Sequence, residues 1–362
     1  MLKPNIIMIS SSSKAGGGPS HIFLLKKLIQ KDFNIFYAMP KSKNLKKYIN
    51  KNNYVEISER KISLIDIFKL IIFLRNNSIN IIHAHGKGAS VIGRILKLLT
   101  GKNLIYTFHG VHTDCLNLRQ KLIYIWYEKL FGWIDDHKIF VSKSEMQQAL
   151  ELNFKILDRF SIINNSVINM PFKKKTNLKL ENPKLGIKNS NPNIVSICRL
   201  VDQKNVFEIF KIAKKMPNYN FLVIGDGELY VKAKNYLIKF NITNVYMFGN
   251  KRNVFKYLNI SEIFLSTSLY EGHPISILEA MSIGLPILAS KVVGNVNTID
   301  DGISGFYYHI GNIQMACKFL KQVLNNDNLK YKMSKASFFK QRKSFSIKKM
   351  RNSYLTLYKK YI

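Results

Sequence analysis

Short apolar runs alternate with helical patterns through the first 152 residues, and this alternation constrains the fold more than any other feature. The runs at 5–10, 33–39 and 80–83 indicate buried strands. Further strands are predicted at 103–108 and 138–141, and helices at 64–76, 90–99 and 144–152. Strands that alternate with helices imply a parallel sheet covered by helices. Ligands of such sheets bind at the carboxyl ends of the strands.

The length of 362 residues leaves room for two domains, each with its own core. Residues 171–192 mix Asn, Lys and Pro without a sustained period, and we interpret them as a linker. The predicted division is an N-terminal domain at 1–180, a C-terminal domain at 181–343 and a final helix at 344–362. The sequence therefore predicts an α/β protein with two Rossmann-like domains.

The net charge of +34 comes from 56 basic and 22 acidic residues. Such a charge attracts polyanions, either nucleic acid or an anionic membrane leaflet. The richness in Asn, Lys and Ile could equally come from an AT-rich genome. No RNA-recognition, zinc-finger or helix-turn-helix signature is present. We therefore expect an anionic membrane surface as a partner and no nucleic acid.

The three cysteines, Cys115, Cys198 and Cys317, are scattered without metal-type spacing. A sparse, odd set favours reduced thiols in the cytoplasm. The apolar run near the N-terminus is too short for a signal peptide, and no stretch reaches transmembrane length. The expected location is cytoplasmic, with peripheral association at the inner face of the cell membrane.

The stretch 270–281 carries the chemistry that is easiest to interpret. Pro274 suits the first position of a helix, and apolar residues then recur at helical spacing. Glu271 precedes this helix and Glu279 lies on it. The unpaired N–H groups of a helix N-terminus suit a phosphate, while carboxylates suit sugar hydroxyls. Helix capping and surface charge are the alternative roles of the carboxylates, but the combination fits a nucleotide sugar.

Two cations flank a predicted strand-to-helix turn after the strand at 193–199. A guanidinium at Arg199 and an ammonium at Lys204 can neutralise a diphosphate without a metal, although surface charge alone also explains single basic residues. The glycine-rich loop at 11–20 lets the backbone at Gly17 and Gly18 approach an anion or a sugar, or is only a turn.

Three histidines fall at the ends of predicted strands: His83, His85 and His109. A histidine beside glycine is often only a hydrogen-bonded turn residue. The pair His83 and His85 could also bind zinc, but no third ligand is placed convincingly, so we predict no metal.

The segment 118–133 contains both tryptophans, Trp126 and Trp133, among basic residues. A helix of this kind suits the headgroup zone of a membrane. Packing against the sheet is the alternative that the pattern favours. Basic residues nearer the N-terminus form a second candidate membrane contact, namely Lys41, Lys43, Lys46, Lys47 and Lys51.

The motif E-G-x-P-x4-E-A at 271–280 closely resembles the donor-binding motif of the retaining glycosyltransferases of family 4. The run from Arg199 to Lys204 is similar to the family's G-R-L-x-x-x-K-G, with Cys198 and Asn205 in place of its glycines. The sequences H-x-H-G and T-x-H-G, which contain His85 and His109, match the family's N-terminal domain. The resemblance implies the GT-B fold, in which two Rossmann-like domains face each other across a cleft and the last helix crosses back to the first domain.

The resemblance also implies roles for single residues. Glu271 would contact the transferred sugar, Glu279 the ribose, and His109 the sugar or the acceptor. The expected catalytic residues are His109, Glu271, Arg199 and Lys204. The expected donor-binding residues are Gly17, Gly18, Arg199, Lys204, Asn250, Glu271, Gly272, His273, Pro274, Ile275 and Glu279.

The implied activity is transfer of a sugar, with retention of configuration, from a nucleotide sugar to a lipid-linked saccharide. A UDP-sugar donor and a polyprenyl-diphosphate-linked acceptor are expected, in the synthesis of bacterial O-antigen, lipopolysaccharide or capsule. The first domain would bind the acceptor and the second the nucleotide sugar, without a cofactor or metal. The alternatives are a non-hydrolysing nucleotide-sugar epimerase and, with less support, a basic nucleic-acid-binding protein.

Overall fold

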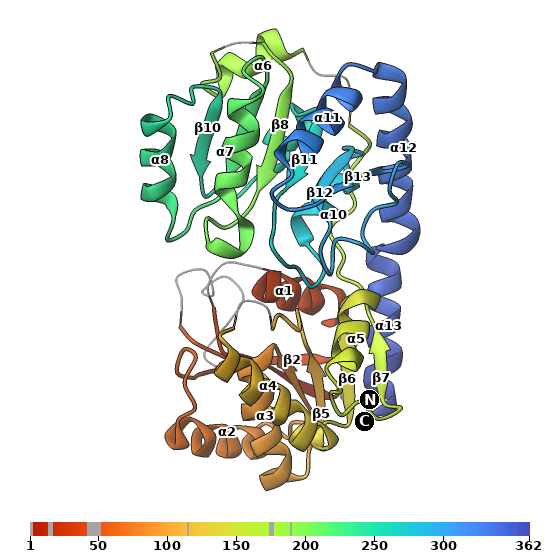
Figure 1. Ribbon diagram of the computed structural model, residues 1–362. Helices are drawn as coiled ribbons and strands as arrows, with labels where there is room; N and C mark the ends of the chain where they lie inside the picture. Colours follow the sequence, from red (N-terminus) through yellow and green to blue (C-terminus); the bar gives the residue numbers. More distant parts are fainter. Residues whose placement is uncertain (1–2, 14–16, 42–51, 114–115, 174–176, 189) are drawn as a thin grey trace. The chain divides into compact units, whose positions relative to one another are not determined.

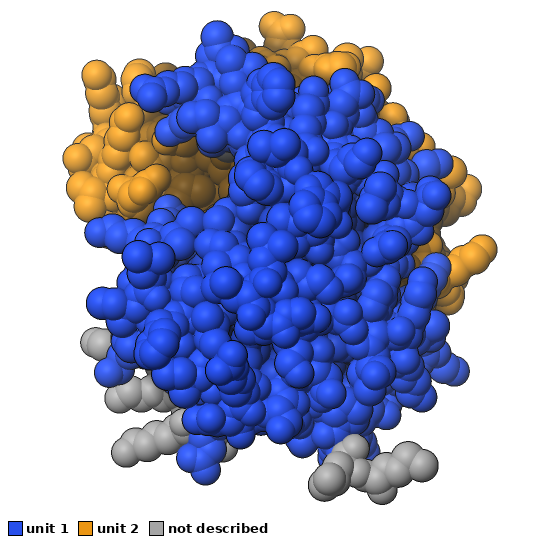
Figure 2. All heavy atoms as spheres, turned by 90° about the horizontal axis from the view of Figure 1, so that it is seen from below, with its two compact units in different colours: residues 1–166, 347–362 blue, residues 167–346 orange. Residues whose placement is uncertain are grey.

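The computed structural model describes residues 3–13, 17–41, 52–113, 116–173, 177–188 and 190–362 (Figure 1). The chain divides into two compact units, which Figure 2 distinguishes by colour. Unit 1 comprises residues 1–166 and 347–362, and unit 2 comprises residues 167–346. The domain ranges expected from the sequence remain predictions.

Unit 1 contains, within its described residues, a seven-stranded parallel sheet in the order β3-β2-β1-β4-β5-β6-β7. Strand β1, an interior strand of this sheet, is apolar at its four middle positions, as expected for a strand that is covered on both faces. The elements of unit 1 are β1 (Asn5–Ser10), α1 (Gly17–Ile29), β2 (Asn34–Met39), β3 (Tyr54–Glu56), α2 (Leu64–Asn76), β4 (Ile81–His85), α3 (Lys87–Thr100), β5 (Asn103–Thr107), α4 (Leu118–Phe131), the 3₁₀ helix η2 (Gly132–Ile134), β6 (His137–Phe140), α5 (Lys143–Glu151), β7 (Phe160–Ile162) and α13 (Ile347–Lys360).

Alternate side chains of β1 enter separate cores on the two faces of this sheet. Ile7 and Ile9 pack with the buried sides of α2, α3 and α4. Ile6 and Met8 pack with α1 and α13. The last helix of the chain therefore completes the core that the first strand begins.

Helix α4 packs against the rest of unit 1 through a narrow strip of its surface. Its buried residues, Tyr124 and Glu128, lie one turn apart on that strip. Trp126 is 67% exposed, and Trp133, in η2, is 56% exposed. The predicted packing of this helix against the sheet is confirmed, because Tyr124 joins the core on that face, while both tryptophans stay exposed. Most of its apolar side chains face outward, since their spacing places them away from Tyr124 and Glu128.

Unit 2 contains, in the part that the structure describes, a six-stranded parallel sheet in the order β10-β9-β8-β11-β12-β13. Two cores, one on each face, draw on alternate residues of β8: Ile194 enters one and Val195 the other. The elements of unit 2 are α6 (Leu178–Lys184), β8 (Asn193–Ile197), the 3₁₀ helix η3 (Asp202–Lys204), α7 (Val206–Lys214), β9 (Asn220–Ile224), α8 (Tyr230–Lys239), β10 (Val245–Gly249), α9 (Phe255–Asn259), β11 (Ile263–Ser266), α10 (Ile275–Ser282), β12 (Ile287–Ser290), β13 (Gly305–Tyr308), α11 (Ile313–Leu324) and α12 (Asp327–Ser344).

The predicted linker at 171–192 contains a short helix, α6, which sequence reasoning missed. Asn177 caps it by accepting a hydrogen bond from the backbone N–H of Lys179 at 3.1 Å. The helix is only seven residues long and contains Pro183 near its end, so no helical period could be recognised.

Each sheet has a point at which the strand order reverses, between β1 and β4 in unit 1 and between β8 and β11 in unit 2. Crossover helices diverge there to opposite faces and leave a crevice at the carboxyl ends of the strands. These positions locate the candidate sites.

Of the lysines predicted to form a second membrane contact, those at 43–51 lie outside the described residues, while Lys41 is exposed. Among the described helices, none combines the length and hydropathy needed to cross a bilayer.

The buried tyrosines of α13 provide a test of how much the last helix stabilises unit 1. Tyr354 is fully buried, and its hydroxyl meets His21 Nε2 at 3.0 Å. We expect Tyr354→Ala to reduce the free energy of unfolding of unit 1 by about 3–5 kcal/mol, because it leaves a large cavity. Thr356→Ala, at an exposed position on the same helix, should change it by less than about 0.5 kcal/mol. Calorimetric unfolding of both variants measures this difference, and equal stabilities would contradict the assigned packing.

Candidate functional site

In unit 2, backbone hydrogen bonds fix the loops that follow β8 and β11 against each other. Leu269 donates its N–H to the carbonyl of Gln203 at 2.8 Å, and Gln203 Nε2 donates to the carbonyl of Tyr270 at 3.0 Å. The Thr267 hydroxyl donates to the carbonyl of Lys204 at 2.8 Å. These contacts hold η3 beside the loop that leads to Glu271.

Lys204 and Glu271 meet as a direct result of this arrangement. The Lys204 ammonium forms an ion pair with Glu271 Oε1, and the two side chains are 15% and 9% exposed. Glu271 is fixed from the other side because its N–H donates to the carbonyl of Val293 at 3.2 Å. The structure therefore brings together two of the predicted catalytic residues in a partly buried, charge-compensated contact.

Two glycine turns shape the backbone around this ion pair. At Gly294, φ is +86° and an added Cβ would lie 2.6 Å from the carbonyl oxygens of Glu271 and Gly272. At Gly225, φ is +139° and a Cβ would lie 1.8 Å from the carbonyl oxygen of Cys198. The loops carrying the predicted site residues therefore pack backbone to backbone, which only glycine allows.

Helix α10 begins at Ile275, one residue later than predicted, and Pro274 takes the N-cap position with φ −74° and ψ 114°. Gly284, with φ +85°, follows its C-terminus. A small pocket is lined by Ser276 from the first turn of α10, by Cys198 and Lys204 from the loop after β8, and by Ser268. The start of α10 and the predicted cation therefore border one pocket at the switch point.

Glu279 lies on α10, where burial raises the pKa of its carboxyl to about 7. His273 is buried, and its ring packs on Phe345 with centroids 4.8 Å apart. Burial, with a smaller effect from the charge of Lys340, lowers the pKa of His273 to about 3. His273 is therefore a neutral residue inside unit 2, next to the loop that holds Glu271.

Other predicted donor-binding residues lie nearer the surface. Arg199 is exposed in the loop after β8, and Asn250 is exposed directly after β10. Gly272, like Glu271, contacts the Gly294 turn. Gly17 and Gly18 belong to unit 1, where they open α1 at the carboxyl end of β1. The roles of all these residues in donor binding remain predictions.

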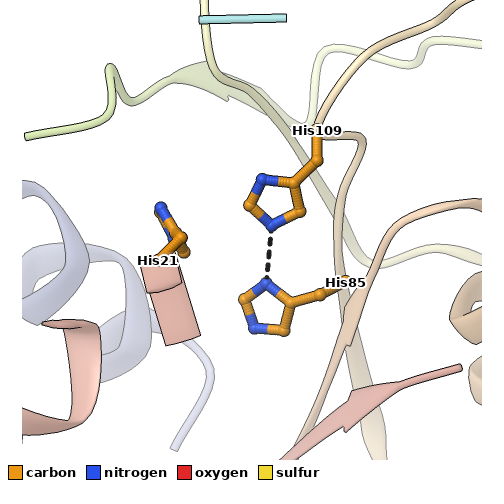
Figure 3. A group of neighbouring side chains, drawn as sticks. All are labelled: His21, His85 and His109. Atoms are coloured by element: carbon orange, nitrogen blue, oxygen red, sulfur yellow. Dashed lines mark hydrogen bonds between the residues drawn. The ribbon is translucent and has the colours of Figure 1, made fainter. Parts of the chain in front are cut away.

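In unit 1, the switch point gathers histidines from three elements (Figure 3). His85 Nδ1 and His109 Nε2 share a hydrogen bond of 3.0 Å, and the His21 ring stands 4.8 Å from the His109 ring. Burial lowers the pKa of His21 to about 4 and those of His85 and His109 well below their ordinary value. The three imidazoles are therefore neutral and can exchange hydrogen bonds with hydroxyl groups.

The histidine nitrogens that could face a metal ion lie within 4.8 Å of one another. However, His21 Nδ1 meets Asn165 Oδ1 at 2.8 Å, and its Nε2 meets the Tyr354 hydroxyl at 3.0 Å. A neutral imidazole that donates from one nitrogen and accepts at the other has no lone pair left for a metal. The hydrogen-bonded arrangement fits a polar network better than a metal site.

Sequence reasoning missed two residues of this cluster, His21 and Glu145. His21 follows the glycine-rich loop, and its proximity to His109 could not be read from spacing. Glu145 accepts hydrogen bonds from the backbone N–H groups of Gly110 and Val141, the latter at 2.6 Å. It thereby fixes the turn at His109, whose φ of +59° lies in the left-handed region.

Comparisons with known proteins agree with this geometry. Residues 16–168 match the family model described as Glycosyltransferase Family 4, and residues 179–338 match Glycosyl transferases group 1. The chain belongs to glycosyltransferase family 4. This family-4 glycosyltransferase has the GT-B type of fold, with two Rossmann-like parallel sheets. The comparisons give the epimerase alternative no support.

This glycosyltransferase is similar, over most of its length, to named relatives and to a solved structure. An Escherichia coli UDP-Gal:alpha-D-GlcNAc-diphosphoundecaprenol alpha-1,3-galactosyltransferase is 28% identical, over 73% of this chain and 70% of the relative. The O-antigen biosynthesis glycosyltransferase WbnH of E. coli is 27% identical, over 82% and 84%. The crystal structure of Anabaena HepE with UDP and glucose aligns with a TM-score of 0.85 and 16% identity, over 99% of this chain and 100% of that one.

Gly294 offers a test of the backbone packing around Glu271 in the glycosyltransferase. We expect Gly294→Ala to destabilise unit 2 by about 2–4 kcal/mol, because strain at positive φ adds to the clash with the Glu271 carbonyl. The control is Gly302→Ala, where φ is +73° but a Cβ has open space, and about 1 kcal/mol of backbone strain is expected there. Thermal unfolding compares the two variants. Equal losses of stability in the two variants would show that the close packing at Gly294 costs nothing beyond the backbone strain.

The raised pKa of Glu279 predicts a pH-dependent stability. The folded chain keeps this proton up to a pKa of about 7, whereas the unfolded chain releases it near 4.5. The contribution of Glu279 to stability is therefore complete below pH 4.5 and falls as the pH rises through 7. Glu279→Gln removes this loss, so the variant should gain about 1–3 kcal/mol over the wild type between pH 5 and pH 8. Urea unfolding at both pH values measures the gain, with the exposed Glu181→Gln as control. If the difference in unfolding free energy between Glu279→Gln and the wild type were the same at both pH values, the burial of the Glu279 carboxyl would be contradicted.

Proposed function

We propose that this glycosyltransferase transfers a sugar from a UDP-sugar to a polyprenyl-diphosphate-linked saccharide during bacterial surface-polysaccharide synthesis, with retention of anomeric configuration. The observation that carries the proposal is the contact of Lys204 with Glu271 at the switch point of unit 2, beside the start of α10. A cation, a helix N-terminus and carboxylates at one place suit the diphosphate and hydroxyl groups of a nucleotide sugar.

The reaction breaks the bond between the anomeric carbon and the diphosphate oxygen, whose electron pair leaves with UDP. An acceptor hydroxyl forms the new bond from the same face, and its proton goes to the departing diphosphate. Negative charge on that diphosphate grows in the transition state, so preorganised cations and N–H groups accelerate the step. Lys204, Arg199 and the first N–H groups of α10 supply this stabilisation.

Glu271 and Glu279 take the roles of hydroxyl acceptors, for the sugar and the ribose respectively. The pairing with Lys204 orients the Glu271 carboxylate before a donor binds. His109, neutral and fixed by His85 and the Glu145 turn, serves as a polar contact to the transferred sugar or the acceptor. No step in this scheme calls on a metal or a cofactor, and we propose that the enzyme works without either.

The names of the relatives support the choice of substrates. One E. coli relative is named for a UDP-galactose donor and an undecaprenol-diphosphate-linked acceptor, and another for O-antigen biosynthesis. The HepE structure was solved with UDP and glucose. An acceptor carried on a polyprenyl lipid lies in a membrane, so we further propose that the enzyme works as a peripheral protein at the cytoplasmic face.

The test combines a donor screen with matched variants. The enzyme is incubated with individual UDP-sugars and a polyprenyl-diphosphate-linked GlcNAc in detergent, and products are identified by mass. Glu271→Gln and Lys204→Met should each lower kcat/KM by roughly 10²–10³-fold, the usual effect of removing one preorganised group. Glu181→Gln, on an exposed ion pair of the same unit, should leave the rate unchanged.

Wild-type turnover by Glu271→Gln would overturn the site assignment. Unaltered binding of UDP to Lys204→Met, measured by calorimetry, would remove that residue from the diphosphate site. If no UDP-sugar yields a product with any lipid-linked acceptor, the proposed substrates are wrong even though the family assignment stands.

A further inference from the structure

Helix α4 and the 3₁₀ helix η2 that follows it present an apolar surface to solvent, which we call the α4 face: Leu118, Leu122, Ile123, Trp126, Leu130 and Trp133. Each of these side chains is between 49% and 73% exposed. Four of them, Leu122, Ile123, Trp126 and Leu130, line an open groove of about 620 Å³ together with Arg119. Water-soluble surfaces seldom expose a contiguous apolar patch that contains large aromatic side chains, and such patches mark contact sites.

The charged side chains of α4 also differ between its two sides: the acidic one is buried, and basic ones lie on the exposed side with the apolar residues. Its one acidic residue, Glu128, is buried and accepts a 2.7 Å hydrogen bond from Arg94. The basic residues Arg119 and Lys129 are exposed. The outward side of the helix therefore combines apolar anchors with cations and carries no acidic residue, so it matches a surface that is apolar inside and anionic outside.

Helix α2, which packs against α3 in the same helical layer, repeats this distribution. Leu64, Ile65 and Phe68 are 86%, 67% and 66% exposed. Its acidic residue, Asp66, is buried and accepts a hydrogen bond from the N–H of Ser58 at 2.8 Å, while Lys69 is exposed. Helices α2, α3 and α4 cover the same face of the unit 1 sheet (Figure 1). Two helices of one layer thus share the same arrangement of apolar and basic residues.

We propose that the α4 face, with α2 as a second contact, is the surface by which the enzyme docks on an anionic lipid bilayer. Tryptophan prefers the headgroup level, aliphatic side chains enter the acyl boundary, and Lys and Arg pair with lipid phosphates. The net charge of +34 attracts the whole chain to such a surface, and the apolar side chains select where it is held. The choice of a bilayer as partner rests on the proposed lipid-linked acceptor.

The two tryptophans of the chain both belong to the α4 face, so tryptophan fluorescence, excited where tyrosine does not absorb, reports on this surface alone. Vesicles of phosphatidylglycerol and phosphatidylethanolamine should shift the emission to the blue, and lipids brominated on their acyl chains should quench it. Phosphatidylcholine vesicles should do neither at the same concentration. High salt should weaken binding, because the cations contribute to the attraction.

The matched variants separate docking from overall charge. Ile123→Ser with Leu122→Ser should lower the vesicle partition coefficient by about tenfold or more, because two apolar anchors are lost. The control, Ile238→Ser with Lys239→Glu on helix α8 of unit 2, changes a side chain that is 78% exposed and a neighbouring cation. That control should bind vesicles within about twofold of the wild type, because its change of two charge units is small beside the net charge of +34 and is screened by salt. Thermal unfolding confirms that each variant is folded.

Several outcomes would overturn the proposal. Vesicle binding without a blue shift would show that another basic surface makes the contact. Equal loss of binding in the α8 control would leave only non-specific charge attraction. A wild-type dimer that dissociates in Ile123→Ser with Leu122→Ser would assign the α4 face to self-association. Transfer to a detergent-dispersed acceptor is measured in parallel: if it persists while docking fails, the proposed function stands and this proposal falls.

Discussion

The ion pair of Lys204 with Glu271 is the contact on which the candidate site of unit 2 depends. It joins the loop after β8 to the loop after β11, the two strands at which the order of the sheet reverses. Two charges in a partly buried place stabilise each other only while both are present, since either one alone would be left uncompensated. A diphosphate that approaches this pair competes for the ammonium. We therefore expect donor binding to rearrange a preformed contact instead of assembling a new one.

Sequence reasoning succeeded where one element determines its own structure. The run 5–10 and the pattern at 64–76 match the bounds of β1 and α2, because each contains an uninterrupted period. The motif around Glu271 was informative for the same reason: a loop, a proline and a helix follow one another within a dozen residues. It could not give the partner of Glu271, since Lys204 lies 67 residues away. That pairing follows from the order of the strands, which no local pattern specifies.

The failures share a physical cause, namely contacts that only the tertiary structure makes. His21 joins His85 and His109 because α1 and β4 meet at a switch point, and Tyr354 of α13 fixes its ring. Helix α4 gave an ambiguous pattern, with apolar side chains on more than one side. The buried strip contains Tyr124 and Glu128, whose carboxylate pairs with Arg94 inside the unit. A hydropathy pattern assigns an acidic residue to solvent, so it could not predict this strip.

The placement of acidic residues also bears on the origin of the high positive charge. An AT-rich genome explains many lysines, but it does not explain why several of the 22 acidic side chains are satisfied by neutral donors inside the protein. Asp66 accepts from the Ser58 N–H, and Glu208 accepts from the Tyr308 hydroxyl at 2.9 Å. A carboxylate that accepts hydrogen bonds from neutral groups inside the protein does not pair with a basic side chain at the surface. Lys69 of α2 and Arg119 and Lys129 of α4 are exposed. Salt screens their charge beyond about 10 Å, so short-range contact with an anionic surface is favoured.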